Sequence, residues 1–216
     1  MKILVFGDIH EHIDKIAWID GISNASCLII SGDLTNVGGI ERAKRIIDYI
    51  KLYNPVIYAQ AGNFDKKEVE TFLREEGISL HGNGFMEEHI GIFGVGGSNK
   101  TPFGTPNELD EKEIAFFITQ GYEKVKDAPL KLFICHAPPF NTPLDMVTNG
   151  QHVGSKAVRS FIEDYQPDLC VTGHIHEGKG EFRIGRTLIL NPGPLKNGGY
   201  VEIISDTNSI QGTLKG

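Results

Sequence analysis

The chain has 216 residues, of which 40% are hydrophobic and 23% charged, and its 21 Lys and Arg against 28 Asp and Glu give a formal net charge of −7. This length predicts a single domain over residues 1–216 with room for a sizeable apolar core. The acidic balance argues against a general coat of nucleic acid or anionic membrane, because either partner needs clustered Lys and Arg. It does not exclude a phosphate group held at one local site.

No apolar stretch approaches the roughly 18 residues of a membrane span, so no membrane partner is expected. The first apolar run ends at Gly7 and Asp8, which is too early for a signal peptide. Three cysteines lie in apolar runs without CxxC spacing, which indicates buried, reduced thiols. We therefore expect a cytoplasmic protein, and the sequence sets no oligomeric state.

Short apolar runs rich in β-branched residues alternate with amphipathic segments through most of the chain, as in α/β proteins. Strands apolar on both faces are predicted at Lys2–Phe6, Cys27–Ile30, 55–59, 91–95, Leu130–Cys135 and 168–172. Helices are predicted at 40–52, 66–75, 108–125 and 155–165. The second helix is expected to begin with a capping box of Asp65 and Glu68, and the fourth to have Ser155 as its N-cap.

The last part of the chain has a different pattern. Segments 181–184 and 187–190 flank a turn at Gly185 and Arg186, and Tyr200–Ser205 and 209–214 flank a second polar turn. We expect an antiparallel meander to close the chain. Two earlier loops, 97–107 and 138–154, are long and rich in Gly, Pro, Asn and Thr, and loops of this length inside a compact domain are often functional.

Five of the predicted strands end in a small residue followed by a potential metal ligand. These ligand-type side chains are Asp8, His10, Asp33, Asn63, His136, His174 and His176. The carboxyl ends of strands in α/β sheets gather at one edge, so the seven are expected to converge there. Each one alone is explained better by a turn, a cap or a core position, and only the joint pattern favours a site. Seven ligands exceed the four of a tetrahedral zinc but suit two divalent ions that share a carboxylate and a bridging hydroxide, an arrangement used in phosphoryl transfer.

The segments Asp8-x-His10, Gly32-Asp33, Gly62-Asn63-x-Asp65, His136 and Gly173-His174-x-His176 resemble, in order and approximate spacing, the five motifs of calcineurin-like metallophosphoesterases. The resemblance implies a four-layer αββα sandwich of two mixed β-sheets flanked by helices, with a dinuclear site at the strand ends. It implies one ion held by Asp8, His10 and His176, a second held by Asn63, His136 and His174, and Asp33 as the bridge. Such ligands accept Mn, Fe, Co, Ni or Zn, and Mn is favoured.

The function implied by the resemblance is a metal-dependent phosphoesterase acting on a small phosphate ester. Many members carry His directly after the motif Asn, but here the residue is Phe64, which cannot donate a proton to a leaving group. This departure favours a phosphodiesterase, with a phosphomonoesterase or nucleotide hydrolase as an alternative. The alternative from another class is a non-catalytic interaction module on the same fold, which the intact set of seven ligands disfavours. The acidic balance disfavours extended nucleic acid as substrate.

His152 lies in the long loop after His136 and is the candidate for the missing acid or for substrate binding, with an exposed loop histidine as the alternative. The helix start at Ser155 could help to hold a phosphate. Arg159, Arg183 and Arg186 are either phosphate partners or part of a solvated face. His12, His81 and His89 match no motif and are expected at the surface or at helix starts.

Overall fold

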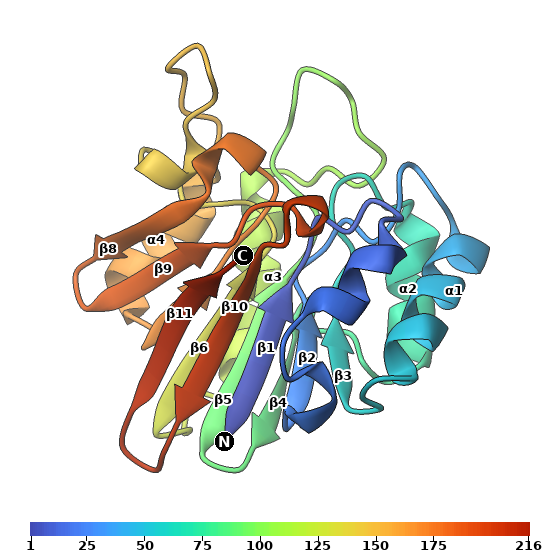
Figure 1. Ribbon diagram of the computed structural model, residues 1–216. Coiled ribbons are helices and arrows are strands. Elements are labelled where there is room, and N and C mark those ends of the chain that lie inside the picture. Colours follow the sequence, from blue (N-terminus) through green and yellow to red (C-terminus); the bar gives the residue numbers. More distant parts are fainter.

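Two β-sheets pack face to face, with helices on both outer faces, in a computed structural model that describes residues 1–216 (Figure 1). The first sheet has the strand order β11-β10-β1-β2-β3 and the second β4-β5-β6-β7-β9-β8. Both sheets contain parallel and antiparallel pairs. The predicted fold of two mixed sheets flanked by helices is therefore confirmed.

The strands of the first sheet are β1 (Lys2–Phe6), β2 (Cys27–Ile30), β3 (Ile57–Ala59), β10 (Tyr200–Ser205) and β11 (Ile210–Lys215). Those of the second are β4 (Asn83–Glu87), β5 (Ile90–Val95), β6 (Leu130–Cys135), β7 (Leu169–Val171), β8 (Gly180–Ile184) and β9 (Thr187–Asn191). The α-helices are α1 (Ile40–Lys51), α2 (Lys67–Glu75), α3 (Glu111–Glu123) and α4 (Lys156–Tyr165). Short 3₁₀ turns are η1 (Ile13–Trp18), η2 (Ile22–Asn24), η3 (Pro143–Asp145), η4 (His176–Gly178) and η5 (Leu195–Asn197).

Three apolar clusters fill the spaces between the four layers. Successive side chains of a strand point to opposite faces, so on β1 Leu4 packs with the cluster under α1 and α2, while Ile3 and Val5 pack between the sheets. The third cluster joins the second sheet to α3 and α4 through side chains such as Phe133 and Phe161. Strands covered on both faces explain the continuous apolar runs of the sequence.

Several details differ from the predicted elements. The two terminal hairpins do not form one meander, because β8 and β9 join the second sheet whereas β10 and β11 join the first. The capping box predicted at Asp65 is wrong, since α2 has Lys66 as its N-cap without a side-chain bond. Strand β4 was not predicted because its sequence, Asn-Gly-Phe-Met-Glu, is poor in β-branched residues.

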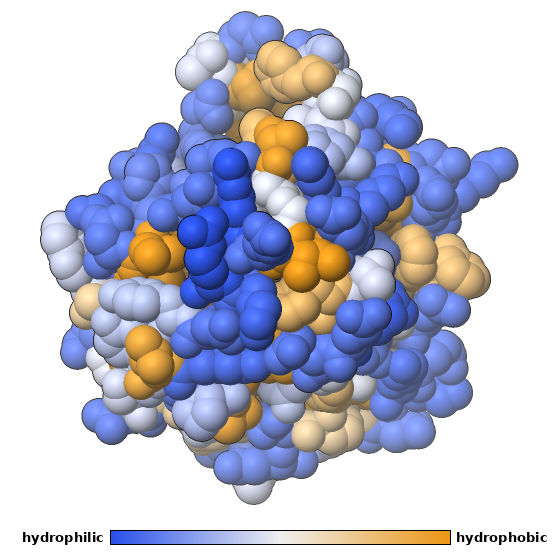
Figure 2. Space-filling model, turned by 90° about the vertical axis from the view of Figure 1, so that its right-hand side faces the viewer, coloured by the Kyte–Doolittle hydropathy of each residue, from blue (hydrophilic) through white to orange (hydrophobic).

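None of the helices is long and apolar enough to cross a bilayer. The face covered by α1 and α2 is mostly hydrophilic, with separate apolar patches rather than one apolar band (Figure 2). The three cysteines are buried and free, as expected.

The expectation that His81 lies at the surface or at a helix start is wrong. Its side chain is only 7% exposed, and its Nδ1 accepts the N–H of Gly96 at 3.1 Å. The ring packs against Phe117, with 4.1 Å between the ring centroids. Burial, together with the nearby positive charge of Arg74, lowers the pKa of His81 to about 4.

The variant His81→Asn is expected to make the free energy of unfolding less dependent on pH below about pH 6.5. The folded protein holds the pKa of His81 below that of the unfolded chain, so its contribution to stability is present above about pH 6.5 and is lost as the pH falls towards 4. The wild type should therefore lose about 2 kcal/mol more unfolding free energy than the variant between pH 7 and 4.5. Urea unfolding of metal-free protein at both pH values measures this, and equal losses in the two proteins would contradict it.

Candidate metal centre

The seven predicted ligand residues lie at the carboxyl ends of strands from both sheets. In Figure 1 these ends point to the edge from which two long loops, 97–107 and 138–154, project. Two groups of side chains there have ligand atoms within 4.8 Å of one another. One contains Asp8, His10 and His176, and the other Asp33, His136 and His174.

The first group surrounds the carboxylate of Asp8. One of its oxygens, Oδ1, lies 3.4 Å from Nε2 of His176 and 4.0 Å from Nε2 of His10. The backbone N–H of His174 donates to both oxygens of Asp8, at 3.2 and 3.1 Å. Burial raises the pKa of Asp8, but the hydrogen bond to His176 and the neighbouring histidines outweigh it and lower the pKa to about 2. Asp8 is therefore ionised at neutral pH.

Asp33 lies between the two groups. Its Oδ2 is 3.4 Å from Nε2 of His136 and 3.7 Å from Nε2 of His10, whereas its Oδ1 accepts the N–H of Phe64 at 2.8 Å. The rings of His136 and His174 have centroids 5.3 Å apart. A single carboxylate thus reaches histidines of both groups.

Four of the seven residues have left-handed backbone conformations. The φ angles are 47° at Asp8, 46° at His10, 52° at Asp33 and 66° at His174. Non-glycine residues in this region cost about 1–3 kcal/mol each and cluster at functional sites, where the surrounding structure holds them. The strain sets the direction in which these side chains leave the strand ends.

Glycines next to the ligands allow the close approach. A Cβ on Gly32 would lie 2.5 Å from Nδ1 of His136, and one on Gly62 would lie 2.1 Å from Oδ1 of Asp33. Each side chain larger than hydrogen would therefore displace a ligand. This explains why small residues precede the ligand positions in the sequence.

Hydrogen bonds around His136 and Asn63 indicate a place for a positive charge. Nδ1 of His136 lies 3.2 Å from the carbonyl oxygen of Ser31, so in the neutral ring Nδ1 carries the proton and Nε2 has a lone pair. Oδ1 of Asn63, also a lone-pair atom, lies 3.0 Å from this Nε2. Two such atoms repel unless a proton or a metal ion lies at them. The donor set of imidazole nitrogens, carboxylates and one neutral amide oxygen fits a divalent cation.

The pKa values of the second group show how much negative charge gathers at the site. Burial lowers the pKa of His136, but Asp33 and the other carboxylates outweigh this effect and raise it to about 9. Burial and the neighbouring His136 lower the pKa of His174 to about 4. The carboxylates thus stabilise a positive charge at His136 and would stabilise a cation at the same place.

Asp65 fastens two of the ligand loops to each other. Its carboxylate accepts the N–H groups of Leu34 (3.0 Å), Thr35 (2.8 Å) and Gly62 (2.9 Å) and the hydroxyl of Thr35 (2.8 Å). These donors follow Asp33 on one loop and precede Asn63 on the other. Asp65 thus positions the ligands instead of capping α2.

His152 contacts a fully buried carboxylate. Its Nδ1 lies 2.7 Å from Oδ1 of Asp145, which also accepts the N–H of Thr142 at 2.8 Å, and the other oxygen accepts that of Gly154 at 2.9 Å. A carboxylate only accepts, so Nδ1 of His152 carries a proton and Nε2 is the free atom. The loop that carries His152 packs through η3 against η4, which begins at the ligand His176.

The predicted N-cap Ser155 is confirmed, but the start of α4 is not free to hold a phosphate. The carboxylate of Glu111 accepts the Ser155 hydroxyl at 2.7 Å and the N–H groups of Lys156 at 3.1 Å and Ala157 at 2.8 Å. An anion already occupies this helix end. Arg159 is also engaged, since it donates to the carbonyl oxygens of Phe140 and Asn141.

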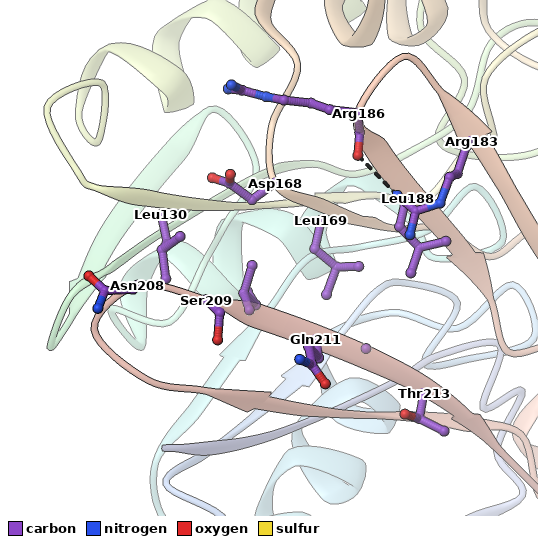
Figure 3. A pocket seen from close by; sticks show the side chains of 12 residues that line it. Leu130, Asp168, Leu169, Arg183, Arg186, Leu188, Asn208, Ser209, Gln211 and Thr213 are labelled. Carbon is purple, nitrogen blue, oxygen red and sulfur yellow. Dashed lines mark hydrogen bonds between the residues drawn. The ribbon is translucent and has the colours of Figure 1, made fainter.

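Arg183 and Arg186 lie far from this centre. They line a cavity of about 480 Å³ whose other residues include Leu130, at the start of β6, and Asp168, just before β7 (Figure 3). The cavity is therefore at the amino ends of these strands, opposite to the ligand groups. Neither arginine is a phosphate partner at the metal centre.

Several contacts at the centre involve residues outside the seven predicted ligands, and of these residues Thr105 does not follow from the sequence. Asn36 donates to the carbonyl oxygen of His10 at 3.0 Å, Thr105 accepts from Asn63 at 3.0 Å, and Phe64 packs edge-on against His10. The long loop 97–107 was the only signal for Thr105. Its contact partner depends on the path of that loop.

A family model described as calcineurin-like phosphoesterase matches residues 1–178. The chain is 36% identical over 202 residues to an uncharacterized protein of Methanocaldococcus jannaschii, covering 90% of this chain and 88% of that protein. A dimetal phosphatase from Danio rerio has a similar structure, with a TM-score of 0.69, 10% identity and coverage of 100% of this chain and 96% of that one. An archaeal phosphodiesterase is similar with a TM-score of 0.55, 16% identity and full coverage of both chains.

Proposed function

The chain belongs to the calcineurin-like phosphoesterase family, a family of phosphate-ester hydrolases, and on this basis we propose that it is a dinuclear metal phosphodiesterase acting on a small substrate. The observation that carries the proposal is the pair of ligand groups joined by Asp33. Two groups sharing one carboxylate suit two divalent ions better than one.

In this proposal Asp8, His10 and His176 hold one ion, and Asn63, His136 and His174 hold the other. Asp33 serves both. When bound, the two ions would supply a Lewis acid for the phosphoryl oxygens and lower the pKa of the attacking water. Mn²⁺ is proposed as the metal, because carboxylate and carbonyl oxygens such as those of Asp8, Asp33 and Asn63 suit it, although the histidines also accept Fe, Co, Ni and Zn.

The residues of the chain itself bind and orient. Asp8 is held by the N–H of His174, Asp33 by that of Phe64, and Asn63 and His136 face each other at 3.0 Å. Asp8, Asp33, Asn63 and His136 therefore each have a partner that fixes their direction, which supports a site partly arranged before substrate arrives. Phe64 packs edge-on against His10 and offers no proton there.

The preference for phosphodiesters rests on Phe64. With no acid at this position, a substrate whose leaving group needs little protonation reacts best. One of the similar structures is described as an archaeal phosphodiesterase. For poorer leaving groups we propose the imidazolium form of His152 as the proton donor, since Asp145 accepts its Nδ1–H and leaves the Nε2–H available for transfer to the leaving group.

A reducing compartment such as the cytoplasm is proposed as the location. The three buried cysteines are free thiols, although Sγ of Cys135 and Cys170 lie only 3.6 Å apart. Free thiols at this separation are typical of reducing conditions.

Turnover is expected to depend on added metal and to be faster on a diester than on a monoester. The test removes metal with a chelator and then adds Mn²⁺, Co²⁺, Ni²⁺ or Zn²⁺ with bis-p-nitrophenyl phosphate or p-nitrophenyl phosphate as substrate. Activity should return with two equivalents of metal per chain. Metal-independent turnover, or none on either substrate, would overturn the metal-dependent hydrolase. A faster monoester reaction would overturn the diester preference alone.

A further inference from the structure

A chain of hydrogen bonds links the long loop 97–107 to the ligand Asn63. We propose that Thr105 and Glu108 are positioning residues that determine which end of the Asn63 amide faces the second metal. The proposal rests on the metal centre described above and adds to it a role for a loop that supplies no ligand.

The carboxylate of Glu108 determines which atoms donate and which accept in this series of hydrogen bonds. Its Oε1 accepts the hydroxyl of Thr105 at 2.8 Å, the N–H of Thr105 at 2.7 Å and the hydroxyl of Thr101 at 2.6 Å. An ionised carboxylate only accepts, so Thr105 must use its single hydroxyl proton on Glu108. The hydrogen bonds from Thr101 and Thr105 also hold the pKa of Glu108 below its usual value, although burial raises it.

The oxygen of Thr105 consequently offers only lone pairs to Asn63. The amide must therefore donate through its NH₂ group, and Nδ2 of Asn63 lies 3.0 Å from Oγ1 of Thr105. Oδ1 of Asn63 is then left facing Nε2 of His136 at 3.0 Å. An inverted amide would place two oxygens without a proton against each other at Thr105. It would also turn N–H groups, which cannot bind a metal, towards the site.

The backbone around Thr105 is docked on the ligand loop. The N–H of Asn107 donates to the carbonyl oxygen of Asn63 at 3.1 Å, and Nδ2 of Asn107 donates to that of Gly62 at 3.1 Å. Asn107 is 7% exposed, so these bonds are shielded from water. The distance between Thr105 and Asn63 is therefore fixed by backbone contacts as well as by the amide itself.

The variant Thr105→Val, matched with Thr105→Ser, tests the proposal. Val has the shape of Thr but cannot accept the amide, whereas Ser can. Mn²⁺ titration of chelator-treated protein by calorimetry should show one of two sites weakened by about 10–100-fold in the Val variant. The other site, and both sites of the Ser variant, should stay within about threefold of the wild type. This readout needs no turnover.

Glu108→Gln and Glu108→Ala form a second pair that separates orientation from packing. The Oε1 of Gln can still accept the N–H and hydroxyl of Thr105, so the Gln variant should bind both ions as the wild type does. In the Ala variant the Thr105 hydroxyl is free to donate to Asn63, so the amide can invert and the same single site should weaken. Circular dichroism of the metal-free variants controls for folding. If Thr105→Val does not fold, the Glu108 pair provides the test of the proposal.

The outcomes distinguish the two proposals. If the wild type binds two ions and Thr105→Val binds both with wild-type affinity, the positioning role is overturned. Equal weakening of both sites would also overturn it, because it would indicate a general structural role. A wild type that binds no divalent ion would overturn the proposed function, and the positioning role with it.

Discussion

Asp33→Asn is expected to lower kcat/KM by about 10³-fold or more. The Asp33 carboxylate lies near ring nitrogens of both groups, 3.4 Å from Nε2 of His136 and 3.7 Å from Nε2 of His10. Its negative charge is needed to hold two cations close together, and the loss of several kcal/mol of transition-state stabilisation corresponds to about three orders of magnitude in rate. Asn keeps the shape and an oxygen for the N–H of Phe64, so the fold should survive.

The measurement is steady-state kinetics on a chromogenic diester with saturating Mn²⁺, together with the number of ions bound. A matched control is Asp48→Asn, which changes an exposed carboxylate on α1 and should leave both quantities unchanged. A variant at position 33 with near-normal activity and two bound ions would contradict the bridging role.

His152→Ala is expected to slow the hydrolysis of diesters with poor, alkoxide-like leaving groups by about 10²–10⁴-fold, the usual contribution of a general acid. Diesters with p-nitrophenolate as leaving group should react almost as fast as before, because this group leaves without a proton. The physical basis is the pair of Asp145 and His152, in which a fully buried carboxylate holds Nδ1 at 2.7 Å and leaves Nε2 free. The measurement is the dependence of kcat on the pKa of the leaving group.

Two further variants control this experiment. His89→Ala removes a histidine of the β4–β5 turn, at the other end of the strands, and should change nothing. Phe64→His in the His152→Ala background returns an imidazole to the position next to Asn63 and should restore part of the rate on poor leaving groups. Identical kcat and KM for the wild type and His152→Ala on all substrates would rule out the acid role.

The central strands and the long helices could be predicted because their patterns are local. Residues 3–6 of β1 are apolar throughout since both faces of the strand are covered, and the apolar stripe of α1 follows the helical period. The assignment of the terminal hairpins to sheets could not be predicted in this way. Whether β10 pairs with β1 depends on contacts between residues about 200 positions apart, which leave no local pattern.

The convergence of the ligand groups was also predictable, because strand ends in such sheets meet at one edge. The residues that support the ligands were not. Asp65 has the spacing of a helix cap, and only the fold shows that its carboxylate faces the N–H groups of another loop. Likewise, the sequence predicts a helix over 108–125, whereas α3 begins at Glu111 and leaves Glu108 in the loop. Side chains that act across loops depend on loop paths, and composition does not determine these.

The position of β10 has a consequence for the order in which the chain can fold. β1 is synthesised about 200 residues before β10, yet β10 is one of its two neighbours in the sheet. All seven proposed ligands lie within residues 1–178, but a nascent chain of that length would expose an unpaired edge of β1 beside the ligand loops. The first sheet can therefore close only after β10 has been synthesised, and such distant pairings fold slowly. Until then, the exposed edge of β1 is where pairing with another nascent chain would begin.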